Sequence, residues 1–225
     1  MRRISVLLAI IASLVLVNTA LAASAKPKLS FVKSGATIGW SSEGGSSPAG
    51  SVSNANTQSL RISVGASPAG ASAYTYGANE DLVGIRGLAL SEIDRLGFDS
   101  KGDLTGGAPR ISLGTQGTDG QHTYFLSAFH CNKPLTGGWR TSDFVHDTVD
   151  CKVFRDGVEM TWAQAVAAAD ANNELVAPTP NDWFLIVDEQ SLTYVDRLTV
   201  QDWCWTGNGT NGIVNENSGD CIDGP

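Results

Sequence analysis

Short runs of alternating apolar and polar residues, separated by glycine-containing turns, constrain the fold of this chain more than any other feature. Leu60, Ile62 and Val64 alternate with polar neighbours, which is the pattern of a strand with one buried face. Turn signals such as Asp119-Gly120 and Asp156-Gly157 separate the later runs. Further runs cover residues 82–90, 93–98, 110–113, 123–129, 183–187 and 194–200. So many short strands predict an all-β antiparallel sandwich of the jelly-roll type.

One segment predicts a short α-helix instead. Thr161 is suited to cap its N-terminus, and Gln164 is placed to complete a capping box. The pair Asn172-Asn173 marks its end. A helix of about ten residues is not stable without tertiary packing. We therefore expect its apolar side to cover an open end of the sandwich, through the residues at helical spacing, Trp162, Val166 and Ala169.

The N-terminal 22 residues have the pattern of a secretory signal peptide. Arg2 and Arg3 are basic, residues 4–17 are almost wholly apolar, and residues 20–22 form a small-x-small cleavage site. The apolar stretch is shorter than the roughly 20 residues that a membrane-spanning helix needs. We expect residues 1–22 to be removed and residues 26–225 to form a single β-sandwich domain. The mature protein is then secreted, extracellular or periplasmic, and not inserted in a membrane.

The charge of the chain limits its partners. It carries 23 acidic and 15 basic residues, a formal net charge of −8, and loss of the signal peptide makes it more negative. Nucleic acid and anionic lipid are poor partners for such a surface, because few basic groups are available to neutralise phosphates. The charge therefore favours a neutral partner or a cation.

An even number of cysteines in an exported chain favours disulfides over free thiols. The four residues allow three connectivities, and none forms the close pairs that zinc sites use. Closing short loops costs the least chain entropy, so we favour two local bonds. These are Cys131 with Cys151 and Cys204 with Cys221.

Two segments resemble strands of the jelly-roll domains found among carbohydrate-binding modules and other galactose-binding-like domains. Residues 58–64 (QSLRISV) are similar to their "g-x-S-L-r-i" strand, and residues 194–200 (YVDRLTV) to their final "Y-V-D-n-v-x-V" strand. Residues 96–113, with Gly106-Gly107-Ala108-Pro109-Arg110, resemble an uncharacterised family of exported microbial proteins. The first resemblance implies a jelly roll, a carbohydrate ligand, and a structural or calcium-binding role for Asp196.

Three tryptophans are the candidate ligand-binding residues. Trp203 and Trp205 flank Cys204, so both indoles project to one face of an extended strand. If exposed, they form a platform for stacking on a sugar ring, whereas if buried they are core packing beside a disulfide. Trp139 follows the turn Gly137-Gly138 and is the better candidate for an exposed ring.

Three aspartates are candidate ligands of a structural Ca²⁺. Asp99 and Asp103 bracket a turn-like segment, although the later glutamate of an EF-hand loop is absent. Asp196 lies in a strand, where its neighbour Arg197 is expected to point to the opposite face. The alternatives are a solvated turn and a carboxylate that binds backbone N–H groups. The three histidines do not have the spacing of a metal-binding motif and are not expected to bind a metal: His122, His130 and His146.

No motif in the chain dictates a reaction. It contains neither a G-x-S-x-G nucleophile elbow nor a phosphate-binding loop that ends in Gly-Lys-Ser/Thr. We therefore expect a secreted non-catalytic domain that binds a polysaccharide or a cell-surface glycan. Two alternatives stay open. One is a structural or adhesive exoprotein that acts through protein–protein contacts, and the other is a polysaccharide hydrolase or lyase that uses a pair of carboxyl groups.

Overall fold

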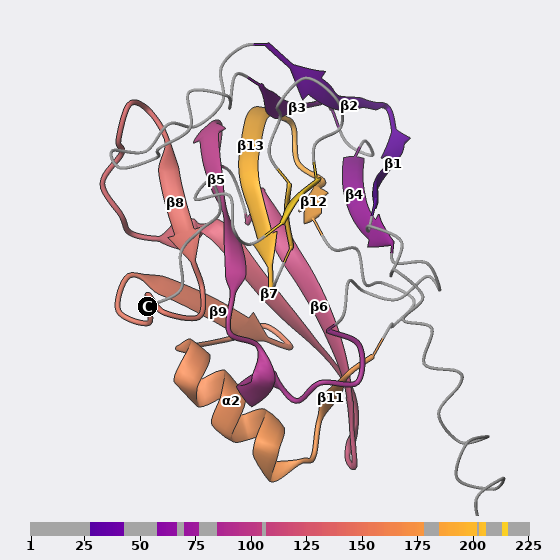
Figure 1. The fold of residues 1–225 in the computed structure, drawn as a ribbon, viewed down its shortest axis with the longest axis vertical. Helices are drawn as coiled ribbons and strands as arrows, with labels where there is room; N and C mark the ends of the chain where they lie inside the picture. Colours follow the sequence, from indigo (N-terminus) through magenta and orange to yellow (C-terminus); the bar gives the residue numbers. More distant parts are fainter. Residues whose placement is uncertain are drawn as a thin grey trace, which may run out of the picture.

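The chain folds into two antiparallel β-sheets with one short helix at one end (Figure 1). The structure, a computed structural model, describes residues 28–42, 58–66, 70–76, 85–104, 107–177, 185–201, 203–205 and 213–215. The all-β architecture with one helix is thus as predicted. The expected signal peptide, residues 1–22, lies outside the described residues. None of the described helices is long and apolar enough to cross a membrane.

The first sheet has the strand order β1-β4-β12-β6-β7-β9-β10, and β11 pairs with β6. At its centre, β6 and β7 form a long hairpin whose turn is at Thr118 and Asp119. The strands are β1 (Lys28–Ser34), β4 (Gly70–Tyr76), β6 (Arg110–Gly117), β7 (Gly120–Cys131), β9 (Cys151–Arg155), β10 (Val158–Met160), β11 (Leu175–Val176) and β12 (Leu185–Val187).

The second sheet is built around the long strand β13. Strand β5 pairs with one edge of β13 and with β8, while β3 and β14 both pair with β13 and lead to β2 and β15. The strands are β2 (Ala36–Ser41), β3 (Ser59–Val64), β5 (Leu96–Gly102), β8 (Arg140–Asp143), β13 (Ser191–Val200), β14 (Trp203–Trp205) and β15 (Ile213–Asn215).

Apolar side chains from both sheets form one buried core. The predicted alternation in β3 is confirmed, because Leu60, Ile62 and Val64 are buried. Ile111 and Leu113 of the first sheet belong to the same cluster. Since alternate residues of a strand point to opposite faces, their neighbours on β6 and β7 lie on the outer face of the first sheet. That outer face carries the groove described below.

Helix α2 (Trp162–Ala171) forms as its sequence predicts. The Thr161 Oγ1 accepts a hydrogen bond from the backbone N–H of Gln164 at 3.2 Å, and the Gln164 side chain accepts one from the Thr161 N–H at 2.9 Å. Trp162 and Ala169 are buried in the core. The helix lies at the end of the molecule away from β1 and β2 (Figure 1).

Two further predictions can be compared with the structure. The disulfide between Cys131 and Cys151 is confirmed, whereas Cys221 lies outside the described residues. The predicted strand over residues 82–90 is wrong in its described part: Leu90–Glu92 is the 3₁₀ helix η1, and Ala89 makes only an isolated bridge with Leu175. The Ala89 N–H donates to the Glu92 side chain at 2.8 Å, and this local bond closes a turn where the apolar run suggested extension.

Candidate functional site

The three tryptophans do not form an open platform. Trp205 is 1% exposed and Trp139 is 9% exposed, while Trp203 is partly buried and packs against the core. The expected exposure of Trp139 is therefore wrong, and of the two alternatives for Trp205 the structure shows core packing. Trp139 forms a bridge with Thr136 that closes its turn, and the Lys101 ammonium lies 5.9 Å from the centre of its ring. Neither indole leaves an open face for a sugar.

The structure brings together two of the three aspartates named as calcium ligands. Asp99 and Asp196 are cross-strand partners on β5 and β13, and both are buried. Asp103 lies four residues further along the chain, about 13 Å away at the usual rise of a strand. Its carboxylate accepts a hydrogen bond from the Leu192 N–H at 3.0 Å. The three carboxyl groups thus do not converge on one ion site.

Arg197 neutralises Asp99 directly. Its Nε lies 2.7 Å from Asp99 Oδ2 and its Nη2 lies 2.9 Å from Oδ1, in a buried bidentate pair. A regular strand would point Arg197 away from Asp99. The pairing of β13 with β5 shifts register between Asp196 and Thr199, and Arg197 has a φ of 44° there. This bulge turns the guanidinium toward Asp99, the cross-strand partner of Asp196. The expectation that Arg197 points to the face opposite to Asp196 is therefore wrong.

A groove with a volume of about 390 Å³ lies on the outer face of the first sheet, and we call it the Phe125 groove. Phe125 and Phe154 are opposite each other on β7 and β9, and both rings are partly buried. The His130 ring lies 4.4 Å from the Phe154 ring, measured between centres. Ser127 also lines the groove. Three aromatic side chains on two neighbouring strands therefore line the groove, with the His130 ring packed against Phe154 and all three partly open to solvent.

An ion pair between Arg110 and Asp188 lines the Phe125 groove. Arg110 Nη1 and Nη2 lie 2.7 and 2.6 Å from the two carboxylate oxygens of Asp188, and the Arg110 guanidinium lies 5.1 Å from the centre of the Phe125 ring. The hydrogen bonds from Arg110 lower the pKa of Asp188 from its usual range. The groove thus combines aromatic surface with a fixed charged pair and a hydroxyl group, the composition of a small-molecule site.

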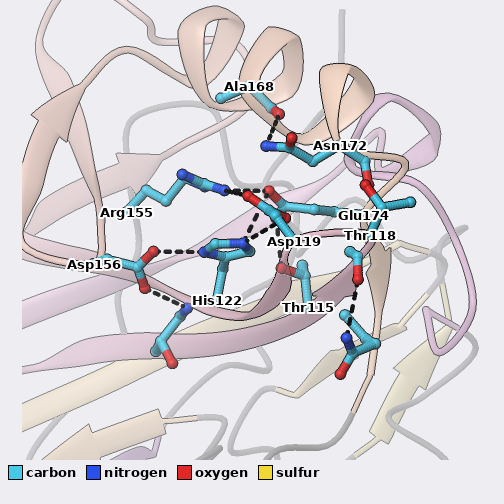
Figure 2. A network of polar contacts seen from close by, with 12 residues as sticks. Thr115, Thr118, Asp119, His122, Arg155, Asp156, Ala168, Asn172 and Glu174 are labelled. Atoms are coloured by element: carbon cyan, nitrogen blue, oxygen red, sulfur yellow. Dashed lines mark hydrogen bonds and ion pairs between the residues drawn. The ribbon is translucent and has the colours of Figure 1, made fainter.

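A second group of polar side chains lies at the opposite end of the β6–β7 hairpin, where His122 is placed between two carboxylates (Figure 2). Its Nδ1 lies 2.6 Å from Asp156 Oδ2 and its Nε2 lies 3.0 Å from Asp119 Oδ1. Partial burial by itself lowers the pKa of His122, but these two hydrogen bonds outweigh it and raise the pKa above its ordinary value of 6.5. The hydrogen bond with His122 lowers the pKa of Asp119.

Glu174 is the buried member of this group, with a side chain that is 0% exposed. Its Oε2 accepts hydrogen bonds from Thr115 at 2.6 Å and Tyr124 at 2.9 Å, and its Oε1 lies 2.6 Å from Arg155 Nη2. Burial opposes ionisation of Glu174, yet these donors lower its pKa. Burial raises the pKa of Tyr124, and the Glu174 carboxylate raises it further. Glu174 therefore stays ionised beside a protonated phenol.

Among the described residues, Asp119, His122 and Glu174 are the one group of potential metal ligands whose ligand atoms lie within 4.8 Å of one another. Arg155 Nη2, however, is 2.6 Å from Glu174 Oε1 and 3.8 Å from Asp119 Oδ2. A guanidinium thus already supplies the positive charge that an ion would bring. The ion pairs and hydrogen bonds of Asp119, His122, Arg155, Asp156 and Glu174 thus link the hairpin, the β9–β10 turn and the residues after α2.

These ion pairs around His122 are expected to stabilise the fold in a defined pH window. The pKa of His122 is raised, so its contribution is complete below its unfolded pKa of 6.5 and is lost as the pH rises through the folded value. The carboxyl groups have lowered pKa values, so their contribution is complete above the unfolded values of 3.8 and 4.5 and is lost as the pH falls through the folded values.

Urea unfolding of the native protein and of His122→Asn tests this window. We expect the free energy of unfolding of the native protein to fall as the pH rises above 6.5 and through the raised pKa of His122. The decrease should be smaller in His122→Asn, because asparagine does not titrate. An equal decrease in both proteins would contradict the role of His122.

Comparison with protein-family models, with curated proteins and with solved structures finds no match for this chain. Its function has to be argued from the chemistry of its sites, since a fold alone does not specify an activity.

Proposed function

We propose that this protein is a secreted, non-catalytic jelly-roll domain that binds carbohydrate in the Phe125 groove. The observation that carries the proposal is the group of partly open rings beside the Arg110–Asp188 pair. Sugar rings present C–H groups on their faces and hydroxyl groups at their edges. Aromatic rings pack against the faces, while charged side chains bind the hydroxyl groups.

The size and location of the groove support this ligand class. Its volume of about 390 Å³ lies within the range of ordinary small-ligand sites. The rings stand on neighbouring strands of one sheet, so they are held in place without a ligand. A pre-formed site loses little conformational entropy on binding. The location differs from the one expected from the sequence, because phenylalanines and a histidine replace the tryptophans as the stacking groups.

The carboxyl groups favour binding over hydrolysis. A glycosidase needs one carboxyl group that stays protonated near neutral pH, and therefore one with a raised pKa. Four carboxyl groups have lowered pKa values: Asp119, Asp156, Glu174 and Asp188. Asp188, which lines the groove, is held ionised by Arg110 and is poorly suited to donate a proton.

Glycan arrays and polysaccharide pull-downs with the purified protein test the proposal. We expect Phe154→Ala to weaken binding about 30-fold, equivalent to about 2 kcal/mol, because truncating a central aromatic anchor removes most of its packing. Val158→Ala is the matched control, since Val158 is 62% exposed on β10 and does not line the groove. Absence of binding to every glycan, or equal binding by Phe154→Ala, would refute the proposal.

A second candidate function is that of a structural or adhesive exoprotein. Phe129 is 50% exposed and Val149 is 79% exposed, and both line a second hollow beside the groove. Exposed apolar side chains that lie together often mark protein contacts. Concentration-dependent self-association without any glycan binding would favour this candidate over carbohydrate binding.

A further inference from the structure

A second hollow, with a volume of about 560 Å³, adjoins the Phe125 groove, and we call it the Arg140 hollow. It is lined by the end of β7 and the beginnings of β8 and β9, next to the Cys131–Cys151 disulfide. His130 lines both the groove and the hollow. A chain of sugar units that lies on the rings of the groove can therefore continue past His130 into the hollow.

Two cations in this hollow have no carboxylate partner among the described residues. Arg140 Nη1 donates to the Ala128 carbonyl at 3.2 Å, and Lys152 Nζ donates to the Thr148 carbonyl at 3.2 Å. The Nε of Arg140 is buried without a hydrogen-bond partner. Backbone carbonyls position these side chains but bring no negative charge to either of them.

In a protein with 23 acidic residues, a cation is expected to pair with a carboxylate. Several form ion pairs with carboxylates: Arg110 with Asp188, Lys133 with Asp147, Arg155 with Glu174 and Arg197 with Asp99. Asp150 also lines the hollow, and its carboxylate opposes one of the two charges there. Arg140 and Lys152 together still leave the hollow with a net positive charge.

We propose that the saccharide ligand is acidic, and that Arg140 and Lys152 bind its carboxylate or sulfate groups. This inference rests on the proposed carbohydrate-binding function, because the rings of the Phe125 groove hold the sugar while the hollow recognises its charge. It differs from the neutral partner that the net charge favours, since a net charge averages over the whole surface while binding depends on the local one.

Paired polysaccharides that differ only in charge test the inference. Affinities are measured for polygalacturonate and its methyl ester, and for dextran sulfate and dextran, so that the carboxylate and sulfate arms are separate. We expect at least one acidic form to bind about tenfold more tightly than its neutral partner, because a hydrogen bond to a charged group is stronger than one to a neutral group. Added salt should reduce this preference.

The variants Arg140→Gln and Lys152→Gln should each reduce the preference for the acidic form. Lys133→Gln is the matched control, because Lys133 is a nearby cation that pairs with Asp147 and does not line the hollow. Thermal unfolding of each variant establishes that it is folded, and Lys152→Gln alone suffices if Arg140→Gln is unstable.

Failure of this inference differs from failure of the proposed function. Equal affinity for neutral and acidic forms, with binding still lost in Phe154→Ala, would overturn the acidic ligand and leave carbohydrate binding intact. A preference for the acidic form that persists in Arg140→Gln and Lys152→Gln would also overturn it. Absence of binding to any polysaccharide would overturn both.

Discussion

Replacing Trp205 with alanine should lower the free energy of unfolding by about 3–5 kcal/mol, which is the usual cost of truncating a fully buried tryptophan. Trp205 is 1% exposed and is among the largest fully buried side chains of the core. Its strand, β14, pairs with β13, and its cross-strand partner Leu198 is buried in the same core. Urea unfolding monitored by far-ultraviolet circular dichroism measures the loss.

Two control variants make this prediction specific. Trp205→Phe should cost much less, because it retains most of the buried ring and removes an indole N–H that has no hydrogen-bond partner among the described residues. Trp203→Ala should also cost less, because Trp203 is only partly buried. A Trp205→Ala protein with native stability and lost glycan binding would contradict its role in the core.

Replacing Asp99 with alanine should destabilise the fold by about 3–5 kcal/mol, because it breaks a buried bidentate ion pair by removing one of its two members. The Asp99 side chain is 0% exposed and that of Arg197 is 10% exposed, so water cannot replace the lost carboxylate. The loss is measured as a shift of the urea midpoint, or as a lower melting temperature if the variant unfolds in the absence of urea.

A double-mutant cycle tests whether the effect belongs to the pair. The combined variant Asp99→Ala/Arg197→Met should be more stable than the sum of the two single changes predicts, because both members of the ion pair are removed together. Added Ca²⁺ should leave the melting temperature of the native protein unchanged if Arg197 neutralises Asp99. Additive single effects, or stabilisation by Ca²⁺ that disappears in Asp99→Ala, would contradict the assigned pair.

Features set by neighbouring residues could be predicted from the sequence. The capping box of Thr161 and Gln164 gave the start of α2 correctly, because both partners lie within one turn. Strand β3 was evident from its alternation. The Cys131–Cys151 bond followed from the preference for short loops. Each of these features depends on contacts that are close in sequence.

The Phe125 groove could not be predicted, because its lining comes from strands far apart in the sequence. Phe125 and Phe154 become neighbours only through the pairing of β7 with β9. The register of that pair shifts between Leu126 and Cys131, and the irregularity brings His130 beside Phe154. A period-two pattern contains no signal for such a shift, since extra residues in one strand reverse the faces that follow.

The group formed by Asp119, His122, Arg155, Asp156 and Glu174 could not be predicted for a related reason. Its members come from the β6–β7 hairpin, from the end of β9 with the turn that follows, and from the residue before β11, three segments that meet only in the folded chain. The two Asp-Gly turns were visible in the sequence, but not that their aspartates bind the same histidine. The burial of Trp139 and Trp205 cannot be decided from the sequence, because sequence spacing gives the face of a strand and not what covers it.

A crystal structure of the protein with the oligosaccharide that binds it most tightly is the most direct test of carbohydrate binding in the Phe125 groove. We expect a sugar ring to pack on Phe125 and Phe154, with its hydroxyl groups at Arg110 and Asp188. A sugar bound instead at β14, against Trp203, would contradict this location of the site.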